Sequence, residues 1–302
     1  METGSKMSSR NIDQKQALLD QVITHLTGRL GARQTKLAEV YLQYYFRRVP
    51  IDDIVHEAPS TLATIVSSQL EFLKYRAPGE TLIRIYNPSL EEQGWESDHT
   101  IIEMVNDDMP FLVDTATLTL AELDLGVHLI IHPVMRVKRD DKGKLISVYQ
   151  KKGKLGSAES IMQFQVDRRT RKKDLAEIEC RLKAALADVW SAVSDWRAME
   201  GKASEARQRL ASWAPQVEKG LMNECREFMQ WLMDDYFIFL GVRDYRISKH
   251  KGRYQLTIVP DSGLGILRET DKTVTSRPLS SLADEARRRK QKNPLIITKT
   301  NA

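Results

Sequence analysis

The chain has 302 residues, of which 41% are hydrophobic and 29% are charged, with a formal net charge of +5 at pH 7. This composition is typical of a globular protein in water, and the length predicts about two domains. No apolar run approaches the roughly 20 residues that cross a bilayer, and no signal peptide is evident, so we expect a cytoplasmic protein without a membrane partner. Two cysteines exclude a disulfide scaffold. Basic and acidic residues are interleaved, which argues against nucleic acid as a partner.

Both ends of the sequence look like the limits of an excised piece. METGSKM at the start has a second methionine after a short polar leader, so we assign residues 1–9 to an expression leader. PLIITKTNA at the end stops just after a β-like run that lacks a neighbour downstream. We therefore expect a fragment of a longer protein.

Residues 10–77 are predicted to be helical. Apolar side chains recur there at helical spacing in three successive runs. Pro50 separates the second run from the third, and Ala77-Pro78-Gly79 ends the pattern, so a domain boundary is placed at residue 78.

Residues 78–199 alternate between β-like and helical patterns. The predicted strands and helices, in order, are strands at 81–88 and 100–106, a helix from Pro110 to Leu125, strands at 127–138, 145–149 and 160–168, and a long helix that carries Leu175 to Trp196. Strand, helix, strand, strand, helix is the ferredoxin-like arrangement of helices on an antiparallel sheet. The predicted fold class is therefore α+β.

The remaining sequence predicts a second, incomplete unit. Residues 200–235 are assigned to a helical linker that begins polar and alanine-rich and ends in an amphipathic helix. Residues 236–302 begin with a predicted hairpin that turns near Lys251-Gly252, followed by a short helix around 281–291 and the final β-like run. This pattern predicts the start of a second α+β module.

The candidate ligand site is the loop Asn106, Asp107, Asp108, Met109, Pro110 and Phe111, which connects a strand to a helix N-terminus. Unpaired backbone N–H groups at such a position attract a carboxylate, and either aspartate can bind an ammonium group. The simpler interpretation is that one aspartate caps the helix and Pro110 occupies its first turn. Capping is the favoured reading, since two adjacent acids repel an anion.

The same helix has a second apolar side, formed by Phe111, Leu118 and Leu125, which lies nearly opposite its core-facing side. A two-sided apolar helix packs on its own sheet with one side and on another surface with the other. These three residues are therefore a candidate partner interface.

Three other motifs favour structural roles. His128 and His132 lie in a β-branched context, where their rings are about 13 Å apart and cannot share a metal, so no metal site is predicted. DSGLGILRET (261–270) lacks the third glycine of a dinucleotide loop, which favours a tight turn. The basic clusters 168–173 and 287–290 have no interleaved aromatic residues, which favours a solvated surface.

Five segments in order, NDDMPFLVDTATLTL, IHPVMRVKRDDKGKL, ESIMQFQVDR, FIFLGVRDYR and PLIITKTN, resemble the N-terminal region of the large bacterial NAD-dependent glutamate dehydrogenases. The resemblance covers most of residues 12–302. It implies ACT-type βαββαβ modules that precede a catalytic domain. It also implies that NAD belongs to the parent protein, with no cofactor and no catalytic residue in this fragment.

The resemblance implies a regulatory and assembly role within an oxidoreductase of amino-acid metabolism. ACT modules commonly bind an amino-acid effector where the first strand meets the first helix, which here is Asn106 to Phe111. Many ligand-binding members have glycine directly after the proline, and this chain has Phe111. The expected partners are a homo-oligomer and the downstream catalytic domain. The alternatives are a free-standing amino-acid sensor or oligomerisation module, and a nucleic-acid binder.

Overall fold

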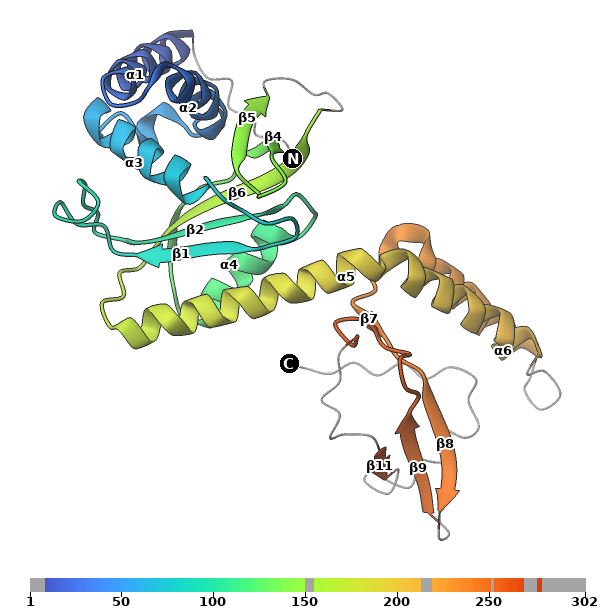
Figure 1. The fold of residues 1–302 in the computed structure, drawn as a ribbon. Coiled ribbons are helices and arrows are strands. Elements are labelled where there is room, and N and C mark those ends of the chain that lie inside the picture. The colour runs from blue at the N-terminus through green and yellow to red at the C-terminus, as the bar shows by residue number, and fades with distance from the viewer. Residues whose placement is uncertain (1–8, 150–154, 213–218, 251–252, 269–275, 279–302) are drawn as a thin grey trace. The chain divides into compact units, whose positions relative to one another are not determined.

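The computed structural model describes residues 9–149, 155–212, 219–250, 253–268 and 276–278 (Figure 1). Its mixture of helices and antiparallel sheets confirms the predicted α+β class. The chain forms two compact units, Met1–Leu186 and Ala187–Ala302. The predicted helix at 281–291, the basic cluster 287–290 and the final β-like run lie outside the described residues.

The first unit begins with a layer of helices. They are α1 (Ser9–Thr27), α2 (Ala32–Tyr45), the 3-10 helix η1 (Ile51–Asp53) and α3 (Pro59–Phe72). Proline at the first position of α3 suits a helix start, because the missing N–H would have no helical partner there. Leu19, Val22 and Leu26 of α1 are buried in the same core as residues from α2, α3 and the sheet. The helical layer and the sheet therefore share one hydrophobic core.

A six-stranded antiparallel sheet follows. Its strands are β1 (Leu82–Tyr86), β2 (Thr100–Asp107), β3 (Val127–Ile131), β4 (Val134–Arg139), β5 (Leu145–Tyr149) and β6 (Ser157–Val166). The order is β1-β2-β6-β4-β5, and β3 also pairs with β6. The single strand predicted at 127–138 is thus two strands along one neighbour. Pro133 separates them, because proline has no N–H to donate to a β ladder.

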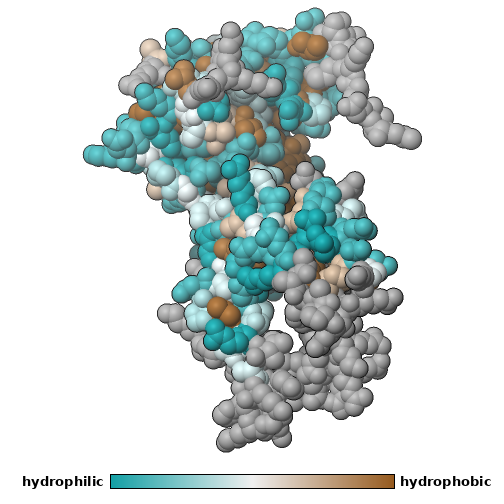
Figure 2. Space-filling view, turned by 90° about the vertical axis from the view of Figure 1, so that its right-hand side faces the viewer, coloured by the Kyte–Doolittle hydropathy of each residue, from teal (hydrophilic) through white to brown (hydrophobic). Residues whose placement is uncertain are grey.

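The sheet is covered on both faces. Ile101 and Val105 of β2 belong to the core shared with α1–α3, and alternation along the strand turns Ile102 and Met104 to the opposite face. Figure 1 shows α1–α3 on one side of the sheet, with α4 (Leu112–Glu122) and the start of α5 (Lys172–Ser212) on the other. Figure 2 shows a visible surface that is mainly hydrophilic, with scattered apolar residues.

The edge strand beside β2 comes from an unexpected place in the sequence. The predicted strand–helix–strand–strand–helix order is present as β2, α4, β3 with β4, β6 and α5. In a βαββαβ module the last strand follows the second helix, whereas here β1 precedes β2 and pairs along it from Leu82↔Val105 to Tyr86↔Ile101. No described strand after α5 joins this sheet. Instead α5 continues to Ser212, through the polar, alanine-rich segment whose residues favour helix.

The second unit contains the remainder of α5 and short elements. These are α6 (Lys219–Trp231), the π-helix η2 (Leu232–Tyr236), β7 (Gly241–Val242), β8 (Tyr245–His250), β9 (Arg253–Ile258), β10 (Leu264–Gly265) and β11 (Ser276–Pro278). β8 and β9 form the predicted hairpin. Asp195 of α5 accepts hydrogen bonds from the Gly265 N–H at 2.8 Å and from Arg268 Nε at 2.9 Å.

No helix among the described residues is long and apolar enough to cross a membrane.

Candidate functional site

The loop from Asn106 to Phe111 connects β2 to α4, as predicted, but its local structure differs from the capping interpretation. α4 begins at Leu112, its N-cap residue is Phe111, and no side chain caps it. Neither aspartate is therefore the cap, and Pro110 lies before the first helical turn. Phe111 adopts φ 71°, the left-handed conformation that favours glycine. The backbone at Phe111 therefore has a conformation that favours glycine while the residue carries an aromatic side chain.

The polar side chains at the start of the loop already have hydrogen-bond partners, although the buried Asn106 Oδ1 has none among the described residues. Asp107 Oδ1 accepts a hydrogen bond from Arg76 Nη2 at 2.9 Å. Asn106 is buried and donates from Nδ2 to Thr81 Oγ1 at 2.7 Å. The Asp108 N–H donates to the Ala158 carbonyl at 3.0 Å, while its side chain is exposed. An incoming ammonium group would therefore compete with Arg76 for Asp107.

Arg76 belongs to a buried ionic cluster that holds the loop to the end of the helical layer. Asp107 and Glu159 are direct neighbours across β2 and β6, so their like charges would repel. Arg76 Nη1 also donates to Glu159 Oε1 at 3.0 Å, and Arg139 binds the same carboxylate through Nε at 2.7 Å and Nη2 at 2.9 Å. Arg139 additionally donates to the Leu73 carbonyl at 2.9 Å. The cluster therefore connects the β2–α4 loop to the segment that follows α3.

The predicted partner interface is only partly at the surface. Phe111 is 40% exposed and Leu118 is 62% exposed, whereas Leu125 is 4% exposed and belongs to the chain's own interior. The Leu125 N–H donates to the Leu120 carbonyl just past the end of α4. The structure therefore brings Phe111 and Leu118 to the surface beside the loop, and it removes Leu125 from that surface.

A polar row crosses the sheet face that contacts the helical layer. Arg84, Glu103 and Gln163 are successive neighbours on β1, β2 and β6. Arg84 Nε donates to Glu103 at 2.7 Å, and burial raises the pKa of the Glu103 carboxyl despite that pairing. Gln163 Oε1 accepts from Gln69 Nε2 of α3 at 2.8 Å and from the hydroxyl of Tyr45. Such buried groups are stable only where each has its partner, so they fix how the helices sit on the sheet.

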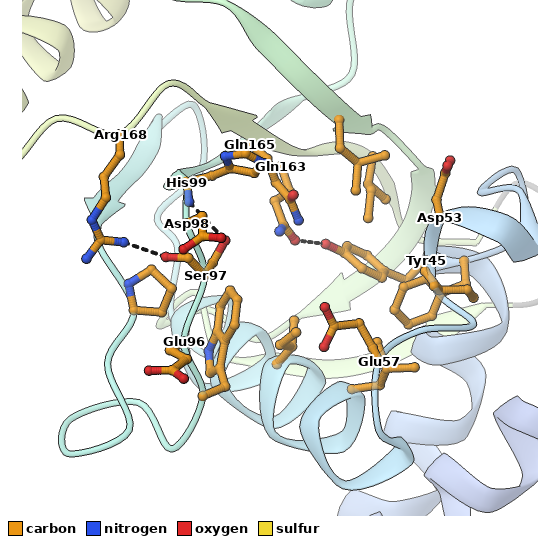
Figure 3. Close-up of a pocket in the computed structure, with 18 of the residues that line it drawn as sticks. Tyr45, Asp53, Glu57, Glu96, Ser97, Asp98, His99, Gln163, Gln165 and Arg168 are labelled. Atoms are coloured by element: carbon orange, nitrogen blue, oxygen red, sulfur yellow. Dashed lines mark hydrogen bonds between the residues drawn. The ribbon is translucent and has the colours of Figure 1, made fainter.

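A pocket of about 620 Å³ opens between the helical layer and the sheet (Figure 3). It lies at the start of β2, whereas the Asn106–Phe111 loop lies at the other end of that strand. Its apolar lining includes Leu62, Trp95 and Ile131. Its polar lining consists of Tyr45, Asp53, Glu57, Ser89, Glu96, Ser97, Asp98, His99, Gln163, Gln165 and Arg168.

Sequence reasoning missed this pocket because its lining is assembled from distant segments. Acids come from the connection between α2 and α3 and from the loop between β1 and β2, and the amides come from β6. The stretch GWESDH (94–99) is the one local signal, since it places an aromatic residue beside two acids and a histidine. No regular spacing marks it as a site.

The two predicted structural histidines have separate surroundings. His128 Nε2 lies 2.8 Å from Asp167 Oδ1, and its ring stacks on that of His99 with centroids 4.3 Å apart. His132 Nε2 lies 2.6 Å from Ser160 Oγ, and burial lowers the His132 pKa. Among the described residues, no cluster of three or more potential metal ligands occurs.

The glycine-containing segment near residue 261 does not fit a dinucleotide phosphate. A Cβ on Gly263 would lie 2.0 Å from the Leu267 carbonyl oxygen, and one on Gly265 would lie 2.1 Å from the Leu240 carbonyl oxygen. The glycines therefore allow backbone to pack on backbone. The carboxylate of Asp195 already accepts the Gly265 N–H, so a phosphate would meet a negative charge there.

Arginines of the basic cluster 168–173 also support loops. Arg168 donates to the Ser97 carbonyl, and Arg169 Nη2 donates to the Asp124 carbonyl at 2.9 Å. Arg171 pairs with Asp174 at 2.9 Å. These side chains contribute to the fold and to the solvated surface.

Comparison with known proteins identifies the class. Residues 41–182 match the family described as "Glutamate dehydrogenase, ACT1 domain". The chain is 34% identical over 265 residues to the NAD-specific glutamate dehydrogenase of Halomonas elongata, covering 85% of this chain and 16% of that protein. It is 28% identical over 250 residues to the NAD-specific glutamate dehydrogenase of Pseudomonas aeruginosa, covering 82% of this chain and 15% of that protein.

The strand–helix–strand–strand–helix unit therefore corresponds to the ACT1 domain, and the match also includes η1 and α3 of the helical layer. The chain matches the N-terminal region of the large NAD-specific glutamate dehydrogenases. It spans about one sixth of the length of the two relatives. The family resemblance inferred from the five ordered motifs is confirmed.

Proposed function

We propose that this chain is a non-catalytic regulatory and assembly segment of a large NAD-dependent glutamate dehydrogenase. The parent reaction is the oxidative deamination of L-glutamate to 2-oxoglutarate and ammonia, with hydride transfer to NAD. The observation that carries the proposal is the ACT1 match over residues 41–182, together with a loop in which Asp107 is already paired with Arg76. Catalysis and NAD binding are assigned to other parts of the parent protein, and the downstream catalytic domain is an expected partner of this segment.

The assembly role rests on the surface next to the loop. Phe111 and Leu118 are large apolar side chains with substantial exposure on one unit. Phe111 also has a left-handed backbone, which costs about 1–2 kcal/mol for a residue other than glycine. A residue kept in a costly conformation at an exposed position is a reasonable contact for a second copy of the chain.

Two measurements test the proposal. Purified chain mixed with glutamate and NAD should form no NADH, and turnover in that mixture would overturn the non-catalytic assignment. Light scattering after size exclusion should show that Phe111→Ser with Leu118→Ser reduces the oligomer. Leu90→Ser, at another exposed leucine (64%), is the matched control and should leave the oligomer unchanged.

The alternative of a free-standing amino-acid sensor predicts a different outcome. An amino acid should then raise the melting temperature of the chain, and Asp108→Asn should abolish the shift, because Asp108 is the exposed acid of the loop. The assembly proposal expects no shift that depends on Asp108.

A further inference from the structure

We propose that the pocket at the start of β2 binds a small aliphatic diamine, a compound with two ammonium groups and a neutral hydrogen-bond acceptor between them. This site is separate from the Asn106–Phe111 loop and does not depend on the regulatory assignment. The pocket volume of about 620 Å³ is within the range of small-molecule sites, about 300–1,000 Å³.

The charge around the pocket favours a cation. Four carboxylates line it, those of Asp53, Glu57, Glu96 and Asp98. None of these four forms an ion pair with a described residue. Arg168 is the one lining residue with a permanent positive charge, and its guanidinium already donates to the Ser97 carbonyl. A concave surface with unbalanced negative charge concentrates cations.

The acids form two pairs on opposite sides of the cavity. Figure 3 shows Glu96 and Asp98 on the side of the β1–β2 loop, and Asp53 and Glu57 across from them on the side of the helical layer. Apolar side chains, including Leu129 and Ile131, line the space as well. Two charged ends joined by an aliphatic chain match this arrangement better than a single cation does.

A buried donor at the pocket indicates where the ligand needs an acceptor. Gln163 is 3% exposed, lines the pocket and points into it in Figure 3. Its Oε1 accepts from Tyr45 and Gln69, and its Nε2 donates to no described residue. Trp95, which also lines the pocket, is 4% exposed, and its indole Nε1 has no hydrogen-bond partner among the described residues. A hydroxyl or other neutral acceptor on the ligand would satisfy a donor of this kind.

Isothermal titration calorimetry of the whole chain at low salt tests the proposal. The probes are 1,3-diamino-2-propanol, 1,4-diaminobutane, butylamine and succinate. We expect the hydroxylated diamine to bind tightest, 1,4-diaminobutane next and butylamine weakest of the amines, with affinity falling as salt screens the charges. Preferential succinate binding would overturn it. So would the absence of heat from every amine at ~10 mM, ten times the ~1 mM Kd that corresponds to about −4.1 kcal/mol.

A variant pair ties the binding to the pocket. Asp53→Asn with Glu57→Gln should weaken 1,4-diaminobutane about tenfold, the order expected when two partly exposed charge partners are lost. Asp52→Asn is the matched control, because Asp52 is an exposed neighbour on η1 that does not line the pocket. Equal affinity in the double variant and the control would refute the assignment, while circular dichroism confirms that both variants remain folded.

Discussion

Replacing Glu159 with glutamine should destabilise the first unit strongly. Glu159 is 1% exposed and receives three hydrogen bonds from Arg76 and Arg139, whose side chains are 3% and 10% exposed. Glu159→Gln keeps the shape of the side chain and removes the charge, which leaves two guanidinium groups buried beside an amide. Breaking a buried ion pair from one side costs about 3–5 kcal/mol. That is a large part of the roughly 5–15 kcal/mol that stabilises a typical domain.

Urea unfolding is monitored by hydrogen exchange in peptides from β2 and β6, so the measurement reports on this unit alone. With a urea dependence of about 1–3 kcal/mol per molar, the midpoint should fall by at least about 1 M. Glu179→Gln is the control, because its partner Lys183 is an exposed neighbour on α5, and its cost should stay within about 0.5 kcal/mol. A Glu159→Gln cost as small as that of the control would refute the view that the cluster is a buried anchor.

Other substitutions test separate features. Gly143→Ala should cost more stability than the ~1–2 kcal/mol expected for Gly79→Ala. Both glycines have positive φ, but only a Cβ at Gly143 would lie 2.3 Å from the Arg76 carbonyl oxygen. Chemical denaturation of both variants measures the difference. Because the pKa of Glu103 is raised in the folded protein, the stabilising effect of its protonated form is present below the unfolded pKa near 4.5 and is lost as pH rises through the folded pKa. The wild-type protein should therefore lose stability relative to Glu103→Gln from pH 4 to 7. Parallel plots of stability against pH for the two proteins would contradict this. The lowered His132 pKa predicts the opposite trend: wild type should lose stability relative to His132→Gln as pH falls below about 6.5, which thermal melts at pH 7 and pH 5 would reveal.

The sequence predicted most of the strands and helices of the first sheet and their order along the chain, because alternation and helical periodicity are local signals. It placed the β2–α4 loop and the β8–β9 hairpin correctly. It merged β3 with β4, although Pro133 was visible, because the β-branched residues on both sides favour strand. It also predicted α4 from Pro110 to Leu125, whereas the helix is Leu112–Glu122. Phe111 adopts a left-handed conformation that nothing in its side chain favours, so local sequence signals do not predict it.

The sites were harder to predict from the sequence because the residues that contact one another there are far apart in the chain. Arg76 and Glu159 are 83 residues apart in the chain, and Tyr45 and Gln163 are 118 residues apart. A lone arginine after a helix gives no sign of its partner. Asp107 was singled out as a ligand-binding candidate in a loop, and its ion pair with Arg76 depends on a fold that composition and spacing do not determine.

The polar row between the helices and the sheet has an evolutionary consequence. Tyr45 and Gln69 on one layer complete the hydrogen bonds of Glu103 and Gln163 on the other, so a change on either side leaves the opposite side with an orphaned group. Substitutions at these positions should therefore occur as coordinated sets among relatives. The helical layer and the sheet should therefore evolve together. A chimera that joins the helices of one relative to the sheet of a distant one should fold poorly unless the residues of the polar row on both layers come from the same relative.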